Sequence, residues 1–333
     1  MPIKSSRRKS LALFAVASIT MLSYSVLNAE MPSTGNKSTD RDEAVALALS
    51  QAQAEECKRF PKRLEAIITE EKVPEVTQQI DAYIRYIPSR KADAQGGKIG
   101  IIESNAEYDY EFKLFRKLPV EFSLSQQYIS IKNSTAVELP AHLVALTAGL
   151  EFTLPFFTVD KTYLRLALNP SFYGDDWNFH SSSFRIPTQA FLIYQPDSRW
   201  TFIGGVAVYP DFEDIVLPIV GFIYKPNDRL VFNIVPRRPN ISYSLNDKIT
   251  LFAEAGTALN SEFEVAKDNL KNVVLDYNEN RLGVGIKYQF NKFIWSSVSA
   301  GGAFNRSLKY RDSLGKVVIK DSAYVEFRVI AAI

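Results

Sequence analysis

The residues best suited to chemistry lie in one short polar stretch, Asp175-Asp176-Trp-Asn-Phe-His180-Ser181-Ser182-Ser183. A histidine oriented by a carboxylate can activate a serine hydroxyl or a water molecule, as hydrolytic and acyl-transfer enzymes do. The stretch is local, however, and its residue types are also those of surface turns. We therefore interpret it as a polar loop and assign no catalytic residue.

Metal and cofactor chemistry has little support in the composition. The chain contains two histidines, His142 and His180, and one cysteine, Cys57. These counts exclude a multi-histidine metal site and an intramolecular disulfide, and the sequence has no glycine-rich phosphate loop. We predict no metal and no cofactor, and we expect Cys57 to be a small buried hydrophobic residue rather than a reactive thiol.

The N-terminus is typical of an export signal. Four basic residues (Lys4, Arg7, Arg8 and Lys9) precede an apolar run from Leu11 to Leu27, and Leu27-Asn28-Ala29 fits a small-residue cleavage site. We expect cleavage after Ala29, with residues 1–29 as the signal peptide. An uncleaved anchor helix is the alternative, although the apolar run has only 17 residues, which is short for a helix that spans a membrane.

Cleavage would make the mature chain slightly acidic. The formal net charge is +2, and residues 1–29 carry four positive charges and no acid, so it becomes −2. The mature chain therefore has no excess of positive charge to attract nucleic acid, and we predict no nucleic-acid partner. An exported domain without disulfides needs another source of stability, which a large closed sheet can provide.

Residues 30–97 are predicted as a helical periplasmic region and linker. Pro61, Pro74 and Pro88 divide about 40–87 into three short helices, because proline ends or kinks a helix. In the third, Val76, Ile80, Tyr83, Ile84 and Ile87 follow helical spacing. A periplasmic partner could bind residues 40–87. The polar stretch 89–97, ending in Gly96-Gly97, is predicted as the linker.

From Lys98 onward the hydrophobic period changes to two, which predicts β-strands with one apolar and one polar face. The clearest case is 281–290, where Leu282, Val284, Ile286, Tyr288 and Phe290 alternate with Arg281, Gly283, Gly285, Lys287 and Gln289. The segments 106–114, 163–169 and 324–330 alternate in the same way. Residues 98–333 are therefore predicted as one all-β antiparallel domain.

A repeat at the turns suggests that the two ends of this sheet differ. Four segments (194–200, 224–230, 243–249 and 288–294) each begin with Tyr, continue through a short Asn- or Asp-containing turn and reopen a strand. Longer connections are expected at Pro170–Ser183, Thr257–Glu279 and Asn305–Lys320. Short turns at one rim and long loops at the other are typical of outer-membrane barrels.

The number of strands is left open at about 12 to 14. We identify thirteen segments: 106–116, 119–131, 140–156, 161–169, 184–194, 199–209, 214–224, 229–236, 240–244, 247–257, 279–290, 294–304 and 320–330. Bacterial single-chain barrels have an even number. Either 98–104 is an additional strand, or 229–244 is one bulged strand.

Three features favour a transmembrane barrel over a soluble periplasmic β-protein. Many polar faces carry long charged residues that suit a wet lumen: Glu107, Asp109, Glu111, Arg165, Glu254, Lys287, Glu326 and Arg328. The 16 Tyr and 22 Phe residues gather at strand ends, where they could sit at the headgroup level. The export signal is the third. The C-terminus departs from the usual pattern of such barrels, many of which end in an aromatic residue that the assembly machinery recognises. This chain ends in Arg328-Val-Ile-Ala-Ala-Ile333, and the nearest match to that signal is Val325 and Phe327.

The segment from Phe191 to Gly256 resembles a known family. Its motifs are Tyr-Gln-Pro-Asp-Ser-Arg-Trp at 194–200, Leu-Pro-Ile-Val-Gly-Phe-Ile-Tyr-Lys-Pro-Asn-Asp from Leu217, and Val-Pro-Arg-Arg-Pro-Asn-Ile-Ser-Tyr from Val235. They are similar to those of an uncharacterised family of Gram-negative outer-membrane β-barrels, catalogued as a domain of unknown function. The resemblance covers about 100–330. It implies a fold and an outer-membrane location, but no reaction and no catalytic residues.

We therefore expect a non-enzymatic outer-membrane barrel that acts as a narrow pore or as a structural or anchoring protein. The alternatives are a lipid-modifying barrel enzyme and a soluble periplasmic β-protein. The expected partners are outer-membrane lipids, lipopolysaccharide and the barrel assembly machinery. The basic pair Arg237-Arg238 could bind lipopolysaccharide phosphates at the outer rim, or anionic lipid at the inner rim.

Overall fold

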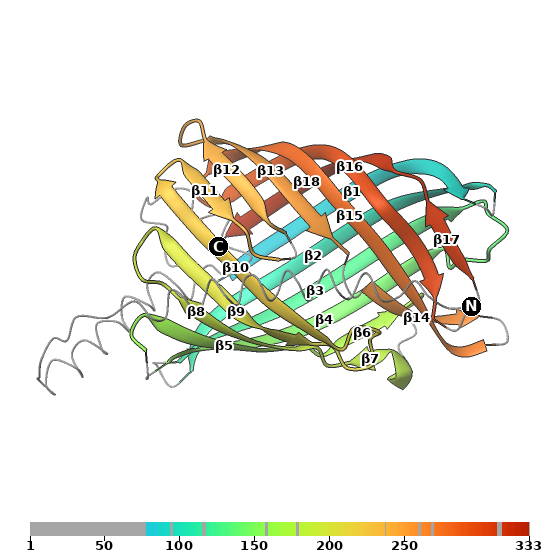
Figure 1. Cartoon of the computed structure of the whole chain (residues 1–333), viewed down its shortest axis with the longest axis horizontal. Coiled ribbons are helices and arrows are strands. Elements are labelled where there is room, and N and C mark those ends of the chain that lie inside the picture. The colour runs from blue at the N-terminus through green and yellow to red at the C-terminus, as the bar shows by residue number, and fades with distance from the viewer. Residues whose placement is uncertain are drawn as a thin grey trace, which may run out of the picture. The chain divides into compact units, whose positions relative to one another are not determined.

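The computed structural model is a closed antiparallel β-barrel (Figure 1). It describes residues 78–93, 96–114, 118–156, 159–177, 180–236, 238–258, 261–267, 270–311 and 315–332. In this part of the chain all the regular structure is strand except one 3₁₀ turn, η2 (Ser181–Ser183). Among the described residues, no helix is long and apolar enough to cross a membrane.

Eighteen strand segments make up the sheet. Their bounds are β1 (Gln78–Asp93), β2 (Lys98–Leu114), β3 (Leu118–Asn133), β4 (His142–Pro155), β5 (Thr162–Leu168), β6 (Ser171–Gly174), β7 (Phe184–Arg185), β8 (Thr188–Tyr194), β9 (Trp200–Val208), β10 (Val216–Asn227), β11 (Leu230–Asn233), β12 (Asn240–Ser244), β13 (Ile249–Thr257), β14 (Ser261–Lys267), β15 (Leu270–Asn291), β16 (Ile294–Tyr310), β17 (Lys316–Ile319) and β18 (Ser322–Ala332).

The barrel wall has 14 strands, because four pairs of segments each form one interrupted strand. β5 and β6 both pair with β4, with the break at Asn169-Pro170. Three more pairs of segments each form one interrupted strand in the same way, because the two members of each pair bond to the same neighbouring strand. These pairs are β7 with β8, β13 with β14, and β17 with β18. The predicted all-β barrel of about 12 to 14 strands is thus confirmed, and its number of strands is even.

Both alternatives that we predicted for reaching an even number of strands are wrong. Residues 98–104 are the first part of β2, and 229–244 contains two separate strands, β11 and β12. The fourteenth strand is β1, which lies between β2 and β18 and closes the barrel. It occupies most of the segment predicted as the third helix, so that prediction is wrong.

The physical reason lies in the side-chain pattern of β1. Ile80, Ala82, Ile84 and Tyr86 face outward, and Ile84 is 51% exposed, whereas Asp81 and Arg85 point inward and are 1% and 3% exposed. A period of two therefore fits this segment as well as a period of 3.6 does. Residues 89–93 of the predicted linker also belong to β1. The two preceding predicted helices and the signal peptide lie outside the described residues.

The four tyrosine-containing turns all lie at one end of the barrel, together with the start of β1 and the end of β18. Each contains an Asp or Asn whose Oδ1 accepts backbone N–H groups two and three residues later, at 2.7–3.0 Å; these residues are Asp197, Asn227, Asn246 and Asn291. The repeat is therefore a real structural unit. We call this end the turn rim and the opposite end the loop rim.

The connections at the loop rim are partly folded into the barrel. The predicted long loops at Thr257–Glu279 and Asn305–Lys320 are mostly strand, formed by β14, β15, β16 and β17. β14 turns inward and makes one parallel bridge to β6, at Glu264 and Gly174. Its Phe263 and Val265 join a buried apolar core with residues of β1 to β4 and β15 to β18. The β14–β15 hairpin therefore packs inside the barrel near this rim.

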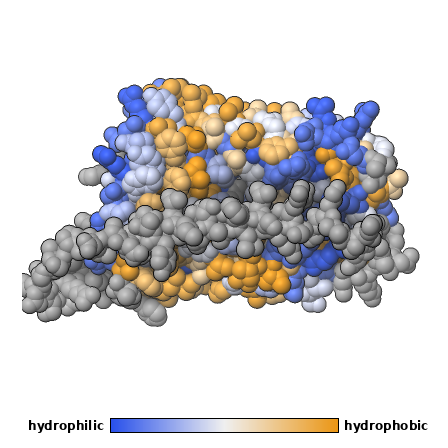
Figure 2. Space-filling view, viewed as in Figure 1, coloured by the Kyte–Doolittle hydropathy of each residue, from blue (hydrophilic) through white to orange (hydrophobic). Residues whose placement is uncertain are grey.

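The outer surface carries an apolar belt. Exposed large hydrophobic residues occur on strands all around the barrel, including Leu124 on β3, Leu168 on β5, Phe202 on β9, Leu251 on β13 and Val284 on β15. Figure 2 shows hydrophobic residues over the middle of the visible face and hydrophilic residues toward both ends. The alternation predicted for 281–290, 163–169 and 324–330 is confirmed. An apolar exterior around a polar interior is the arrangement of a transmembrane β-barrel.

Candidate functional site in the lumen

The charged residues predicted to face the lumen do so. Asp109, Arg165, Glu254, Lys287 and Glu326 are all at most 9% exposed and lie on the inner face of their strands. Charges buried to this extent are stable only when they are paired. The interior of the barrel is therefore organised by ion pairs, most of which join different strands.

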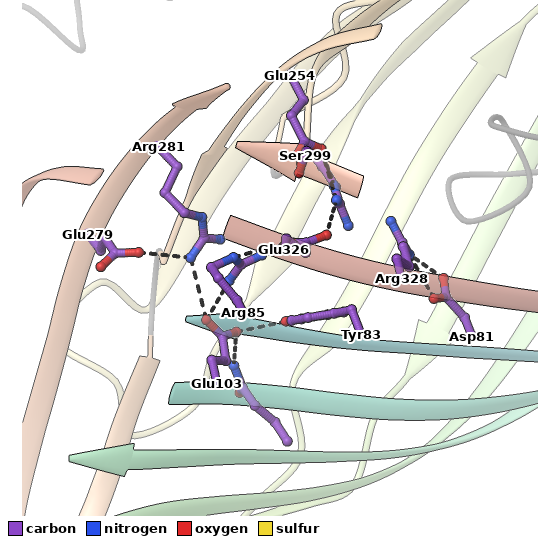
Figure 3. Close-up of polar contacts among 12 residues, drawn as sticks. Asp81, Tyr83, Arg85, Glu103, Glu254, Glu279, Arg281, Ser299, Glu326 and Arg328 are labelled. Carbon is purple, nitrogen blue, oxygen red and sulfur yellow. Dashed lines mark hydrogen bonds and ion pairs between the residues drawn. The ribbon is translucent and has the colours of Figure 1, made fainter. Parts of the chain in front are cut away.

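Arg85 is the centre of the main network (Figure 3). It lies on β1 directly opposite Glu103 of β2 and Glu326 of β18. Its Nη1 is 2.5 Å from Glu103 Oε2, and its Nε donates to Glu326 Oε2 at 2.9 Å. One guanidinium thus joins two carboxylates across β2, β1 and β18, where the first and last strands of the barrel pair.

The network continues from Glu103 toward β15. Glu103 accepts hydrogen bonds from Tyr83 Oη at 2.7 Å and Gln127 Nε2 at 3.0 Å. Arg281 Nη1 lies 3.5 Å from Glu103 Oε2 and 3.0 Å from Glu279 Oε1. Glu279 Oε2 accepts from Arg306 Nε at 2.9 Å. Buried guanidinium and carboxylate groups therefore alternate along the inner wall.

A second branch includes the connection between β11 and β12. Arg238 Nη2 lies 2.6 Å from Glu326 Oε1, and its Nε donates to Glu254 Oε2 at 2.8 Å. Glu254 Oε1 also accepts from Ser299 Oγ at 3.0 Å. The backbone of Ile234 and Val235 comes very close to Gly221. A Cβ atom added at Gly221 would lie 2.6 Å from the Ile234 carbonyl oxygen. The connection is therefore folded into the lumen.

This geometry gives Arg238 a second role besides the one proposed for the basic pair. Its guanidinium forms ion pairs with Glu254 and Glu326 inside the barrel, and lipopolysaccharide binding by the pair stays a prediction. Arg237 lies outside the described residues. Close to the turn rim, Arg328 forms a further lumen pair with Asp81, and its Nε donates to Asp81 Oδ1 at 2.7 Å.

A polar cavity of about 300 Å³ lies beside this network, against β2 to β5 and β8. Amide and hydroxyl side chains dominate its lining, with three carboxylates and three aromatic rings: Asn105, Ser123, Ser125, Gln127, Thr147, Asn169, Gln189 and Ser261; Glu107, Glu121 and Glu151; Tyr173, Tyr209 and Phe263. The rings of Tyr173 and Phe263 make a T-shaped contact, with their centroids 6.0 Å apart. Because Phe263 belongs to the inward-folded β14, the hairpin borders the cavity on its loop-rim side.

The stretch with catalytic residue types is used for local structure. Ser183 Oγ donates to the backbone carbonyl of His180 at 2.8 Å and accepts from the His180 N–H, which closes the 3₁₀ turn. Ser182 Oγ donates to Glu264 Oε1 at 2.6 Å and so ties the turn to β14. These hydroxyl groups serve the backbone and the hairpin. In the described part of the chain, no group of three or more His, Cys, Asp or Glu residues is placed to hold a metal ion.

Sequence reasoning missed the members of the network that come from β1. Asp81, Tyr83 and Arg85 lie in the segment read as a helix, so their partners could not be assigned. The signal was present as alternation of Gln79, Asp81, Tyr83 and Arg85 with Ile80, Ala82, Ile84 and Tyr86. Cys57, by contrast, lies outside the described residues, and its predicted burial stays a prediction.

The comparison with protein families gives one match. The family model described as Domain of unknown function (DUF6268) matches residues 101–331. This range agrees with the resemblance inferred for about 100–330. No curated protein matches the sequence.

Several solved barrels are similar in architecture. The COG4313 outer membrane channel from Pseudomonas putida F1 has 13% identity and a TM-score of 0.43, covering 79% of this chain and 97% of that chain. A TodX monoaromatic hydrocarbon channel mutant has 11% identity and a TM-score of 0.46, covering 78% and 91%. LpxR from Salmonella typhimurium has 10% identity and a TM-score of 0.37, covering 76% and 99%. These similarities concern the fold alone.

Proposed function

The chain belongs to the family described as Domain of unknown function (DUF6268), and we propose that it is a narrow, non-enzymatic outer-membrane channel for small polar solutes. The observation that carries the proposal is the polar cavity of about 300 Å³ inside a closed barrel with an apolar exterior. A purely structural barrel could fill its interior with packed side chains, as small barrels do. Here, hydroxyl and amide groups border open space instead.

The proposed location is the outer membrane. The apolar belt supports it, because contiguous exposed apolar surface of this kind is unfavourable on a water-soluble protein. The signal sequence with cleavage after Ala29 gives a route of export. Insertion would then depend on the barrel assembly machinery, with outer-membrane lipids and lipopolysaccharide as the neighbours of the belt.

Fractionation tests this location. We expect the protein in the outer-membrane fraction, migrating faster on a gel before heating than after it, because a folded barrel remains compact in detergent. Mass spectrometry of that protein should give a mature chain that begins at Glu30. Recovery in the soluble periplasmic fraction would contradict the proposed location.

Conductance tests the channel itself. The full mature protein, folded into planar bilayers, should give discrete conductance steps in KCl. Ser125 lines the cavity, and Leu124, its neighbour on β3, faces outward with 44% exposure. We expect Ser125→Trp to reduce the step size, because the indole ring occupies the cavity, and Leu124→Trp to leave it unchanged. Folded barrels without any conductance would refute the proposal.

A further inference from the structure

Four lysine side chains gather at the loop rim of the barrel. Lys91 of β1 lies directly opposite Lys98 of β2. The backbone N–H of Lys320, which follows β17, donates to the Lys91 carbonyl oxygen at 3.1 Å. Lys132 of β3 is opposite Gly100, two residues beyond Lys98. All four lysines are exposed, and we call them the lysine patch.

The strand pattern places the lysine patch on the outer face of the barrel. Each of its members is adjacent in sequence to a residue that is buried in the apolar core inside the barrel: Ala92, Ile99, Ile131 and Ile319. Successive side chains of a strand point to opposite faces of the sheet. Because these neighbours point inward, the lysines point away from the lumen, toward whatever surrounds the barrel.

Positive charge is in excess around the patch. We consider the described residues at the loop-rim ends of β1, β2, β3 and β17, which are 88–93, 96–100, 130–141 and 315–321. They contain six basic and three acidic side chains: Arg90, Lys91, Lys98, Lys132, Lys316 and Lys320; Asp93, Glu138 and Asp321. The mature chain as a whole is expected to be slightly acidic, so this excess is a local feature.

The pairing of two lysines indicates an anionic ligand. Like charges directly opposite each other, as in Lys91 and Lys98, destabilise an antiparallel pair. The carboxylate nearest to Lys320 offsets little of this charge, because Lys320 Nζ lies 3.8 Å from Asp93 Oδ1 and both side chains are more than half exposed. An anion bound between the lysines would relieve the repulsion.

The patch borders the apolar belt. Tyr86 of β1 is opposite Ile102 of β2 and Val325 of β18, and Tyr86 and Val325 are 54% and 51% exposed. Lys98 is four residues beyond Ile102 along β2, which is about 13 Å at the rise of a strand. Lysine stems can lie along apolar surface while the ammonium groups stay in water. A ligand that contacts both surfaces therefore has acyl chains and an anionic headgroup.

We propose that the lysine patch binds the phosphate groups of lipid A, the membrane anchor of lipopolysaccharide, with its acyl chains against the apolar belt. Ammonium groups bind phosphate as point charges. The loop rim has the longer connections, which lie outside the cell in outer-membrane barrels, and lipid A belongs to that leaflet. The inference rests on the proposed outer-membrane location and goes beyond the proposed channel function.

The test is the binding of lipid A with both phosphates to the full mature protein, folded in detergent. We expect saturable binding to the unmodified barrel. In Lys91→Gln/Lys98→Gln the affinity should fall about 30-fold, because each lysine near an anionic lipid surface contributes roughly a factor of five. The matched control is Lys248→Gln/Lys292→Gln, which removes two exposed lysines from the turn rim and should leave the affinity unchanged.

Further probes distinguish the sources of the phosphate. Lipid A that lacks one phosphate should bind more weakly than lipid A with both. Phosphatidylglycerol and inorganic phosphate, at the same concentration, should not displace bound lipid A. Equal displacement by phosphatidylglycerol would show a general anionic-lipid surface and would overturn the assignment to lipid A.

Stability separates lipid binding from a purely structural role of the lysines. Without lipid A, Lys91→Gln/Lys98→Gln should be at least as stable in urea as the unmodified barrel, because an opposed pair of like charges is removed. With lipid A, the unmodified barrel should gain more stability than the variant, because it binds the ligand more tightly. Lys132→Gln/Lys320→Gln replaces the first variant if that variant does not fold, as judged by migration before and after heating.

Unmodified barrels that do not bind lipid A, or equal affinities in the loop-rim and turn-rim double variants, would overturn the inference alone. Recovery of the protein in the soluble periplasmic fraction would overturn both the inference and the proposed location.

Discussion

At the scale of single residues, the barrel interior is organised by ion pairs, and the sequence reveals these pairs only in part. Alternation was sufficient to predict that Glu107, Arg165, Glu254 and Glu326 point into the lumen. It could not say which charges meet, because pairing depends on strand register between segments far apart in the chain. Arg85 and Glu326, for example, are 241 residues apart.

Arg85 gives the sharpest test at this scale. Arg85→Met keeps much of the side-chain volume but leaves Glu103 and Glu326 without their shared partner in a buried site. Removing one member of a buried pair typically costs about 3–5 kcal/mol, so we expect the free energy of unfolding to fall by about that amount. Urea unfolding of the barrel in lipid vesicles measures it. Arg229→Met, at an exposed turn, is the control and should have little effect.

At the scale of elements, β1 shows how a sequence pattern can support two structures. Ile80, Ile84 and Ile87 fit one face of a helix, yet in the strand Ile84 faces outward and Ile87 is fully buried on the inner face. Propensity alone does not decide between them. The ladders that β1 forms with β2 and β18 decide between them. β18 is far from β1 in the sequence, and β2 was predicted to belong to a different domain because the hydrophobic period changes at Lys98.

The orientation of β1 is testable with one substitution. If Ile84 faces lipid, Ile84→Lys places a charge in the apolar belt, which costs about 2–4 kcal/mol near the bilayer midplane and about 0–1 kcal/mol near the interfaces. Leu245→Lys, at an exposed turn of the turn rim, is the matched control. Equal unfolding free energies for the two variants would contradict the placement of β1 in the membrane-facing wall.

At the scale of the whole molecule, the even number of strands follows from closure rather than from any local pattern. A barrel whose first strand is missing has two free edges, β2 and β18, whose backbone groups have no water to bond with inside a bilayer. The thirteen segments found by alternation could not form a closed antiparallel barrel, which indicated that the count was wrong by one strand, either too low or too high. Its identity required the three-dimensional pairing of β1 with both ends of the sheet.

Deletion of residues 78–93 therefore tests closure directly. The shortened chain loses the ladders of β1 with β2 and β18, together with Asp81 and Arg85, which bond to Arg328, Glu103 and Glu326. We expect it not to fold into a barrel that resists detergent, so its gel migration should be the same before and after heating. As the size-matched comparison, a deletion of 16 residues within 30–77 removes no described strand. A heat-modifiable barrel formed without residues 78–93 would show that the remaining thirteen strands close without β1, and would refute its role as the closing strand.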